Sequence, residues 1–331
     1  MNLLGTLVIV ILVSGDGPTD LPVSEVRSRQ AVVGGLEYLR HEGVKWMQEK
    51  QCASCHHSPF TLWAMNEARG QGFQVDEAAL AEITAWSLAT DNRAKLIAAE
   101  GTPNSEGLSV GAVYTVLGVR AGRGDAAPEG LDRFESHIVS RQQADGSWKS
   151  PEGRAPLFEG QEALTLLSIL ALEPRAGATG PAADASAAGR EKAIAWLAST
   201  PSGGSHQASA LRLLVLSRLN RPAAEIESAA LGLIARQEAD GGWRQTPEMA
   251  SDALATGQSL YALRLSGLNA HAPAIEKGVQ FLVETQRADG SWAMQSRPTK
   301  PGASGASNLG PITYVGTSWA TIGLVRAAPA K

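Results

Sequence analysis

The sequence predicts an all-α protein, an α6/α6 toroid in which six helical hairpins form two concentric layers. Two observations indicate this fold: a segment ending in Asp-Gly and Trp recurs along the chain, and amphipathic helices alternate with helices that are apolar on most faces. Repeats of this kind bury their apolar faces by stacking on neighbouring units. The 331-residue chain is 44% hydrophobic, which is enough for one substantial core.

The repeated segment occurs in three closely matching copies. They are Arg141–Trp148 (RQQADGSW), Arg236–Trp243 (RQEADGGW) and Thr285–Trp292 (TQRADGSW), and their Asp residues lie 95 and 49 residues apart. The first gap therefore has room for two units of about 48 residues, a length typical of repeat architectures. A degenerate copy of the repeat lies in this gap at Ala193–Gly204 and has a turn without the Asp-Gly-Ser-Trp sequence.

Each unit begins with an amphipathic helix that we assign to the outer layer. A proline opens this helix at Pro128, Pro222 and Pro273, where its missing N–H leaves no intrahelical bond unmade. In the last of these helices, apolar residues at positions 275, 279 and 282 repeat at helical spacing with charged residues between them. Asp-Gly then supplies the turn.

A second helix in each unit starts with small and polar residues and becomes apolar, as expected for the inner layer. Two further hairpins are expected earlier in the chain, which makes six, and six hairpins close into one toroid domain over residues 21–331. The expected inner helices start at Gly160, Ser205, Gly257 and Gly316, and the earlier hairpins pair Val23–Lys50 with Pro59–Gly70 and Val75–Ala99 with Leu108–Val119.

The N-terminal residues 1–20 read as a signal peptide or short anchor. Their apolar run is too short to span a bilayer and has the length of a signal-peptide core. No Lys or Arg precedes the run, and no Ala-x-Ala follows it. We expect an exported protein, periplasmic or at the cell surface, with membrane association only through this segment if it is not cleaved.

The charge distribution argues against nucleic acid as a partner. The net charge is −4, both signs are mixed, and the chain has no basic run. We interpret most charged residues as solvated helix faces.

The Gln-x-x-Asp-Gly-Ser-Trp segments resemble the QW repeats of the squalene-hopene cyclase, oxidosqualene cyclase and protein prenyltransferase superfamily. The resemblance covers about residues 128–328 and reaches the first third only through its helix pattern. It implies that each Trp stacks on the Gln that ends an outer helix and ties adjacent hairpins together, so these Trp residues are structural. The implied pairs are Gln142 with Trp148, Gln237 with Trp243, and Gln286 with Trp292.

The sequence lacks the catalytic and metal-binding motifs of that superfamily. The chain lacks the Asp-x-Asp-Asp acid of class II terpene cyclases, the later cysteine that protein prenyltransferases use for zinc, and the thioester motif Gly-Cys-Gly-Glu-Gln. Asp252, a lone carboxylate before an inner helix, is the nearest candidate for a catalytic acid, and a helix N-cap is its favoured alternative. The aromatic content of 5% also argues against a cyclase cavity, where aromatic faces stabilise carbocations.

Polar residues near the starts of inner helices form a candidate ligand site. In a toroid these helix N-termini converge on one mouth, where a polar ring beside free N–H groups suits an anion or a polar ligand. Satisfying those N–H groups is the favoured alternative role. The candidates, which we expect at equivalent positions, are Gln161, Gln207, Gln258 and Thr317, with His56 and His57 just before the first inner helix.

Both cysteines of the chain lie in Cys52-x-x-Cys55-His56, which is the attachment pattern of c-type haem. Two thiols at this spacing reach the two vinyl groups, and His56 follows as an axial iron ligand. The segment resembles those of exported bacterial proteins that join a cytochrome c-type signature to such repeats. A disulfide, a zinc site that adds His57, and a redox dithiol remain open alternatives.

Two functions follow from these observations. The leading hypothesis is an exported toroid that carries one covalent haem c and performs electron transfer or haem redox chemistry at the barrel mouth, with a redox partner. The alternative is a haem-free toroid that binds an isoprenoid in its central cavity or turns it over, with Asp252 as the acid. An interaction scaffold with a filled barrel is a third, and the sequence does not decide whether the protein is an enzyme.

Overall fold

The computed structural model describes residues 23–51, 56–89, 108–121, 128–149, 155–175, 177–268, 271–297, 305 and 307–327. Within these ranges the only extended elements are isolated β-bridges, so the all-α prediction is confirmed for them. The helices are α1 (Val23–Lys50), α2 (His57–Gly70), α3 (Glu77–Leu88), α5 (Val110–Arg120), α6 (Leu131–Ser140), α7 (Gly160–Ala171), α8 (Pro181–Ser199), α9 (His206–Arg218), α10 (Ala223–Ile234), α11 (Ala253–Leu265), α12 (Ala272–Thr285) and α13 (Gly310–Ala327).

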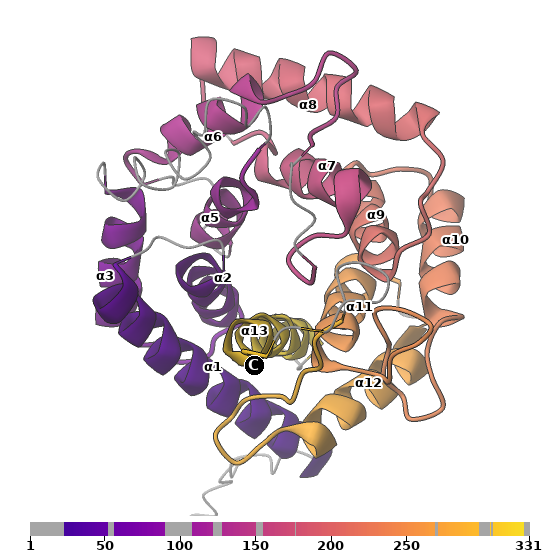
Figure 1. The fold of residues 1–331 in the computed structure, drawn as a ribbon. Helices are drawn as coiled ribbons and strands as arrows, with labels where there is room; N and C mark the ends of the chain where they lie inside the picture. The colour runs from indigo at the N-terminus through magenta and orange to yellow at the C-terminus, as the bar shows by residue number, and fades with distance from the viewer. Residues whose placement is uncertain are drawn as a thin grey trace, which may run out of the picture.

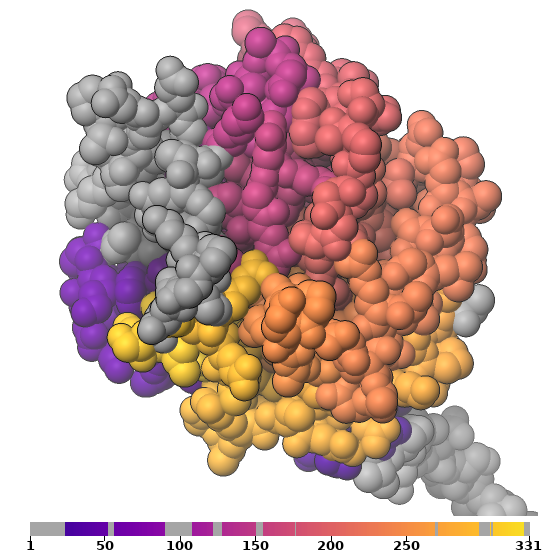
Figure 2. Space-filling model, turned by 45° about the vertical axis from the view of Figure 1, so that its right-hand side comes forward, coloured from indigo at the N-terminus to yellow at the C-terminus, as the bar shows by residue number. Residues whose placement is uncertain are grey.

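The helices alternate between two layers (Figure 1). Helices α2, α5, α7, α9, α11 and α13 lie inside, and α1, α3, α6, α8, α10 and α12 lie around them. Each inner helix packs on the next, and α13 packs on both α2 and α1, so that the C-terminal part of the chain adjoins its N-terminal part. In Figure 2 the yellow C-terminal segment lies beside violet atoms of the N-terminal part of the chain.

Burial follows the two helix patterns seen in the sequence. The inner helix α11 is buried continuously from Ala253 to Leu263, whereas the outer helix α10 buries only Ala230 and Leu233. An outer helix therefore contributes one apolar stripe, and an inner helix contributes most of its surface. The core lies in and around the inner layer.

The three repeated Trp residues connect each outer helix to the inner helix of the same unit. Their side chains are at most 1% exposed. Each indole Nε1 donates to a carbonyl near the end of the preceding outer helix, at 2.7–2.9 Å, and each Trp backbone N donates to a threonine of the following inner helix, at 2.9–3.2 Å. The carbonyls belong to Ile138, Leu233 and Leu282, and the hydroxyls to Thr165, Thr256 and Thr317.

The repeated Gln residues connect each unit to the next. Each side-chain amide donates to the carbonyl of the Gly in its own turn and to a carbonyl of the following outer helix, at 2.7–3.0 Å. Gln142 reaches Gly189 in α8, and Gln237 reaches Ala274 in α12. Gln286 reaches Ala31 in α1, at the other end of the chain. The predicted tie between hairpins is made by the Gln amide, while the Trp binds its own outer helix.

Several helix boundaries differ from the prediction. Helix α11 begins four residues before Gly257 and α13 six residues before Gly316. Both glycines lie inside their helices because a close approach requires them: a Cβ on Gly257 would overlap the Trp319 carbonyl, and one on Gly316 would overlap the Met294 side chain. Helix α3 ends at Leu88, and residues 90–99 of the predicted outer helix Val75–Ala99 lie outside the described residues.

The predicted signal peptide at residues 1–20 also lies outside the described residues. Among the helices that the structure describes, none combines the length and the apolar character needed to cross a membrane.

Substituting Gly241 with Ala is expected to destabilise the fold more than substituting Gly267 with Ala. Both glycines have φ values, +85° and +73°, that cost a residue with a Cβ about 1–2 kcal/mol. At Gly241 the new Cβ would also lie 2.7 Å from the Lys277 carbonyl oxygen in the next outer helix, whereas nothing lies within 4 Å at Gly267. We expect an additional loss of about 1–3 kcal/mol, measured by urea unfolding. Equal losses at the two sites would contradict the role of this turn as an inter-unit contact.

Candidate functional site

Five aromatic side chains from four inner helices meet inside the inner layer. We call them the aromatic cluster: Phe60 and Trp63 from α2, Tyr114 from α5, Tyr261 from α11 and Trp319 from α13. Ring centroids lie 5.0 Å apart between Trp63 and Trp319 and 5.9 Å apart between Trp63 and Tyr261, in edge-to-face geometry. All five are at most 4% exposed. Counting aromatics in the sequence missed this concentration, because its members are far apart in the chain.

A buried carboxylate borders the aromatic cluster. Glu67 is 2% exposed and lies one turn after Trp63 on α2. Its Oε1 accepts a hydrogen bond from the Tyr261 hydroxyl at 2.7 Å and one from Trp63 Nε1 at 3.4 Å, and its Oε2 forms an ion pair with Arg326. Burial and the nearby Glu67 charge raise the pKa of Tyr261 well above its usual range, so Tyr261 remains a hydrogen-bond donor.

A cavity of about 350 Å³ opens beside this carboxylate. Most of its lining residues lie in the last turns of inner helices, so it occupies the mouth formed by their C-termini. Its volume is at the lower end of typical ligand pockets, about 300–1,000 Å³. The apolar part of its lining consists of Trp63, Leu117, Ala121, Leu170, Pro174, Leu214 and Tyr261, and the charged part consists of Glu67, Arg120, Glu173, Arg218 and Arg326.

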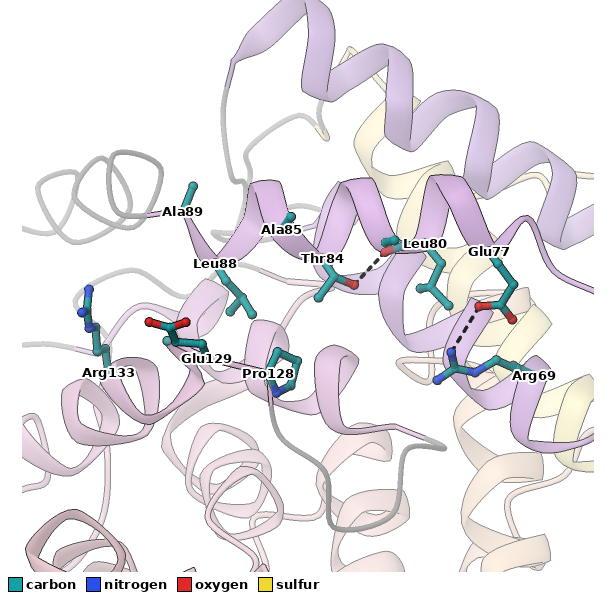
Figure 3. Close-up of a pocket in the computed structure, with 12 residues that line it drawn as sticks. Arg69, Glu77, Leu80, Thr84, Ala85, Leu88, Ala89, Pro128, Glu129 and Arg133 are labelled. Atoms are coloured by element: carbon teal, nitrogen blue, oxygen red, sulfur yellow. Dashed lines mark hydrogen bonds and ion pairs between the residues drawn. The ribbon is translucent and has the colours of Figure 1, made fainter.

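A larger groove of about 580 Å³ lies between α3 and the start of α6 (Figure 3). Three of its polar side chains bind one another or the backbone: Arg69 pairs with Glu77 at 3.3 Å, and Thr84 donates to the Leu80 carbonyl at 2.7 Å. The groove lies in the outer layer and has no aromatic lining residue, so we assign the ligand site to the smaller cavity.

Asp252 is the N-cap of α11, as the favoured alternative predicted. Its Oδ1 accepts hydrogen bonds from the backbone N–H groups of Leu254 and Ala255 at 2.9 and 3.0 Å, and its Oδ2 accepts one from Gln245 at 3.0 Å. Burial raises the pKa of Asp252 to about 6 against the opposing effect of these hydrogen bonds. It lies nine residues, or roughly 14 Å along a helix, from Tyr261 at the cavity.

The predicted polar ring does not have the expected register. The Trp-to-Thr hydrogen bonds place Thr165, Thr256 and Thr317 at equivalent positions of three units. Gln161 precedes Thr165 by four residues and Gln258 follows Thr256 by two, so the predicted equivalence of Gln161, Gln258 and Thr317 is wrong. Small and polar residues continue past the helix start in each unit. Composition alone therefore does not show which residue of one unit is equivalent to which residue of the next.

Two of the predicted ring residues support loops. Gln161 donates to Ser147 Oγ at 2.6 Å. Gln207 accepts a hydrogen bond from the Glu159 backbone N at 2.7 Å and donates to the Leu157 carbonyl at 3.2 Å. These contacts agree with the alternative in which such residues satisfy backbone and loop groups.

Gln258 differs from them because it is buried without a hydrogen bond. It is 2% exposed, and neither its Oε1 nor its Nε2 has a partner among the described residues. The indole Nε1 of Trp319 is equally buried and lacks a partner in that same part of the chain. Gln258 precedes Tyr261 by three residues, so both lie on one face of α11. Unpartnered buried polar groups are uncommon, and a water molecule or a ligand is one explanation for them.

His57 is enclosed in an aromatic stack at the opposite mouth. Its ring lies 4.1 Å from that of Trp46 and 4.0 Å from that of Tyr314, measured between centroids, and it is 5% exposed. Burial, with a smaller contribution from His56, lowers the pKa of His57 to about 2. His56 Nδ1 contacts His57 Nδ1 directly.

The two cysteines of the haem motif, Cys52 and Cys55, lie outside the described residues. Within the described part of the chain, no three His, Cys, Asp or Glu side chains are grouped so that they could hold a metal ion. Haem attachment through Cys52, Cys55 and His56, like the disulfide and zinc alternatives, therefore stays a prediction.

Comparison with known proteins supports the fold. No protein-family model matches this sequence, and no curated protein matches it. Three solved structures of the type II terpene cyclase MstE from Scytonema are similar, each over 93% of this chain and 99% of theirs. The enzyme without ligand has a TM-score of 0.58 and is 14% identical to this chain. A Tyr-to-Phe variant has a TM-score of 0.58 at 16% identity. An Asp-to-Ala variant in complex with merosterolic acid A, its product, has a TM-score of 0.57 at 14% identity.

Replacing Asp252 with Asn is expected to remove a pH dependence of stability. The pKa is about 6 in the folded protein and about 4 when unfolded, so the folded state binds the proton more tightly, and stability falls as pH rises from about 4 to about 6. The loss amounts to about 2–3 kcal/mol in wild type, whereas Asn caps the helix without titrating. Urea unfolding of both proteins at pH 4 and pH 7 measures it, and parallel pH profiles would refute the assignment.

Expression with haem maturation machinery tests the cysteine motif. We expect an intact mass increased by one haem, and replacing Cys52 and Cys55 together with Ala should abolish the increment. A disulfide would instead lower the mass by two hydrogens, and a zinc ion would dissociate on denaturation. A mass without haem in the wild-type protein would refute attachment.

Proposed function

We propose that this protein is a terpene cyclase-like α6/α6 toroid that holds an isoprenoid chain inside its inner helical layer. The observation on which this proposal rests is the aromatic cluster beside a cavity lined by apolar residues of several inner helices. The likeness to MstE, a type II terpene cyclase, supports the same proposal at the level of fold.

The toroid assignment is supported by the cyclic order of contacts. Successive inner helices pack on one another, and α13 returns to α2. The Gln286 bond to Ala31 joins the last outer helix to the first in the same way. Twelve described helices in this order correspond to six hairpins.

An isoprenoid suits the interior because its chain is apolar and its double bonds can lie against aromatic rings. Leu117, Leu170 and Leu214 line the cavity with Trp63 and Tyr261. Aromatic faces attract cations, with about 2 kcal/mol or more per contact once the site is dry. A carbocation formed on a bound polyene would therefore be stabilised by the aromatic cluster.

In a cyclisation of this class, an acid would add a proton to one alkene, ring closure would move the positive charge along the chain, and loss of a proton would end the reaction. Two buried carboxyl groups are available, Asp252 and Glu67. We assign the acid to Asp252, which lies at the N-terminal end of α11, so that an isoprenoid extending along α11 from the cavity would approach it, and burial raises its pKa to about 6. Glu67 is engaged by Arg326 and Tyr261 at the other end of the inner layer.

Replacing Trp63 with Leu should weaken the binding of farnesol, a neutral C15 isoprenoid alcohol, by about tenfold or more. The substitution removes on the order of 100 Å² of apolar contact area, worth about 2 kcal/mol. Isothermal titration calorimetry measures the dissociation constant. Trp196→Leu on outer helix α8, outside the aromatic cluster, is the control. An unchanged affinity in the Trp63 variant would place the ligand elsewhere.

Turnover distinguishes the two carboxyl groups. Purified protein is incubated with squalene and with farnesol, and products are identified by gas chromatography. We expect Asp252→Asn, which retains a helix cap, to abolish cyclisation, and Glu67→Gln to retain at least part of it. Full activity in the Asp252 variant would contradict the assignment of the acid.

A further inference from the structure

The mouth of the cavity carries more positive than negative charge. Three guanidinium groups line it, those of Arg120, Arg218 and Arg326, against the two carboxylates of Glu67 and Glu173. Cations in the last turn of a helix are favoured by the helix dipole, and this effect accounts for their general placement. It does not explain why their side chains surround an apolar cavity.

Two of the three guanidinium groups are committed to structural contacts. Arg326 pairs with Glu67. Arg120 donates to the Ala171 carbonyl at 2.7 Å and lies 3.8 Å from Glu135 Oε1. These contacts connect neighbouring inner helices at their C-terminal ends.

Arg218 is the third, and it is the least engaged. Its Nε lies 4.0 Å from Glu173 Oε1, beyond hydrogen-bond distance, and it donates no hydrogen bond to any described residue. The side chain is 45% exposed, so it reaches both the cavity and solvent. Arg218 lines the same cavity as Arg326 and as Tyr261, the tyrosine that binds Glu67.

We infer that the ligand is an amphiphile with one negative charge, an isoprenoid carboxylic acid, whose carboxylate binds Arg218 at this mouth. The inference rests on the proposed function and names the substrate class. A guanidinium group offers two parallel N–H donors to a carboxylate. Arg218 is the one incompletely engaged guanidinium group among the described lining residues, which matches a single carboxylate and falls short of a diphosphate. The hydrocarbon chain then extends from the mouth along Leu117, Leu214 and Trp63.

Gln258 and Trp319 indicate a second polar group on the same ligand. Both side chains are at most 2% exposed and present polar atoms that have no partner among the described residues. Gln258 lies about one turn further from the mouth than Tyr261 on α11. A hydroxyl or carbonyl group on the ligand would satisfy the amide, because Gln offers both a donor and an acceptor.

Calorimetric titration with farnesoic acid and farnesol tests the inference, because these two C15 probes differ only in the carboxylate. We expect wild type to bind the acid at least tenfold more tightly than the alcohol and the preference to shrink at high salt. Arg218→Met keeps the apolar part of the side chain and should remove most of the preference without changing alcohol affinity. Arg221→Met is the matched control, since Arg221 pairs with Glu225 on the surface and does not line the cavity.

The outcomes separate this inference from the proposed function. Equal affinities of wild type for acid and alcohol, or a preference that survives in Arg218→Met, overturn the carboxylate inference and leave isoprenoid binding standing. Absence of binding for both probes overturns both. Because Arg218 is half exposed, its variant should melt within a few degrees of wild type, and circular dichroism verifies this before titration.

Discussion

The hydrogen bonds from the repeated Gln amides to the next outer helix are the interaction on which this architecture depends. The outer helix α10, for example, buries only Ala230 and Leu233. Each Gln amide donates to its own turn and to the following unit, so that the position of one helix determines that of the next. The bond from Gln286 to Ala31 spans 255 residues of sequence and joins the two ends of the array.

The packing of α13 on α2 brings inner helices that are distant in sequence together and assembles the candidate site. Trp63 and Trp319 meet because α13 packs on α2, and Tyr261 reaches Glu67 across 194 residues of sequence. Gly257 allows α11 to pack closely on α13, since a side chain there would overlap the carbonyl of Trp319. The same close contacts that stabilise the core therefore assemble the aromatic surface of the candidate site.

The two mouths of the inner layer have different chemistry. At the helix N-termini, polar side chains satisfy backbone groups: Asp252 and Ser205 cap α11 and α9, and Gln207 binds the loop before α7. At the C-termini, arginines offset the partial negative charge of the helix ends and surround a cavity. At the first mouth these polar side chains hydrogen-bond to the protein itself, and only Asp252 also has a proposed chemical role. The second mouth retains an incompletely engaged guanidinium group, which is why the ligand headgroup is assigned there.

The sequence alone determined the helices, the repeat, the burial of its three tryptophans and the cap at Asp252, because each is a local pattern of spacing and composition within one unit. Only the tertiary structure decided that the equivalent inner residues are Thr165, Thr256 and Thr317, that the aromatic side chains converge, and that the cavity lies at the C-terminal mouth. These features depend on how far each helix slides and turns against neighbours that are distant in sequence. That geometry comes from packing across the closed ring, which no local pattern records.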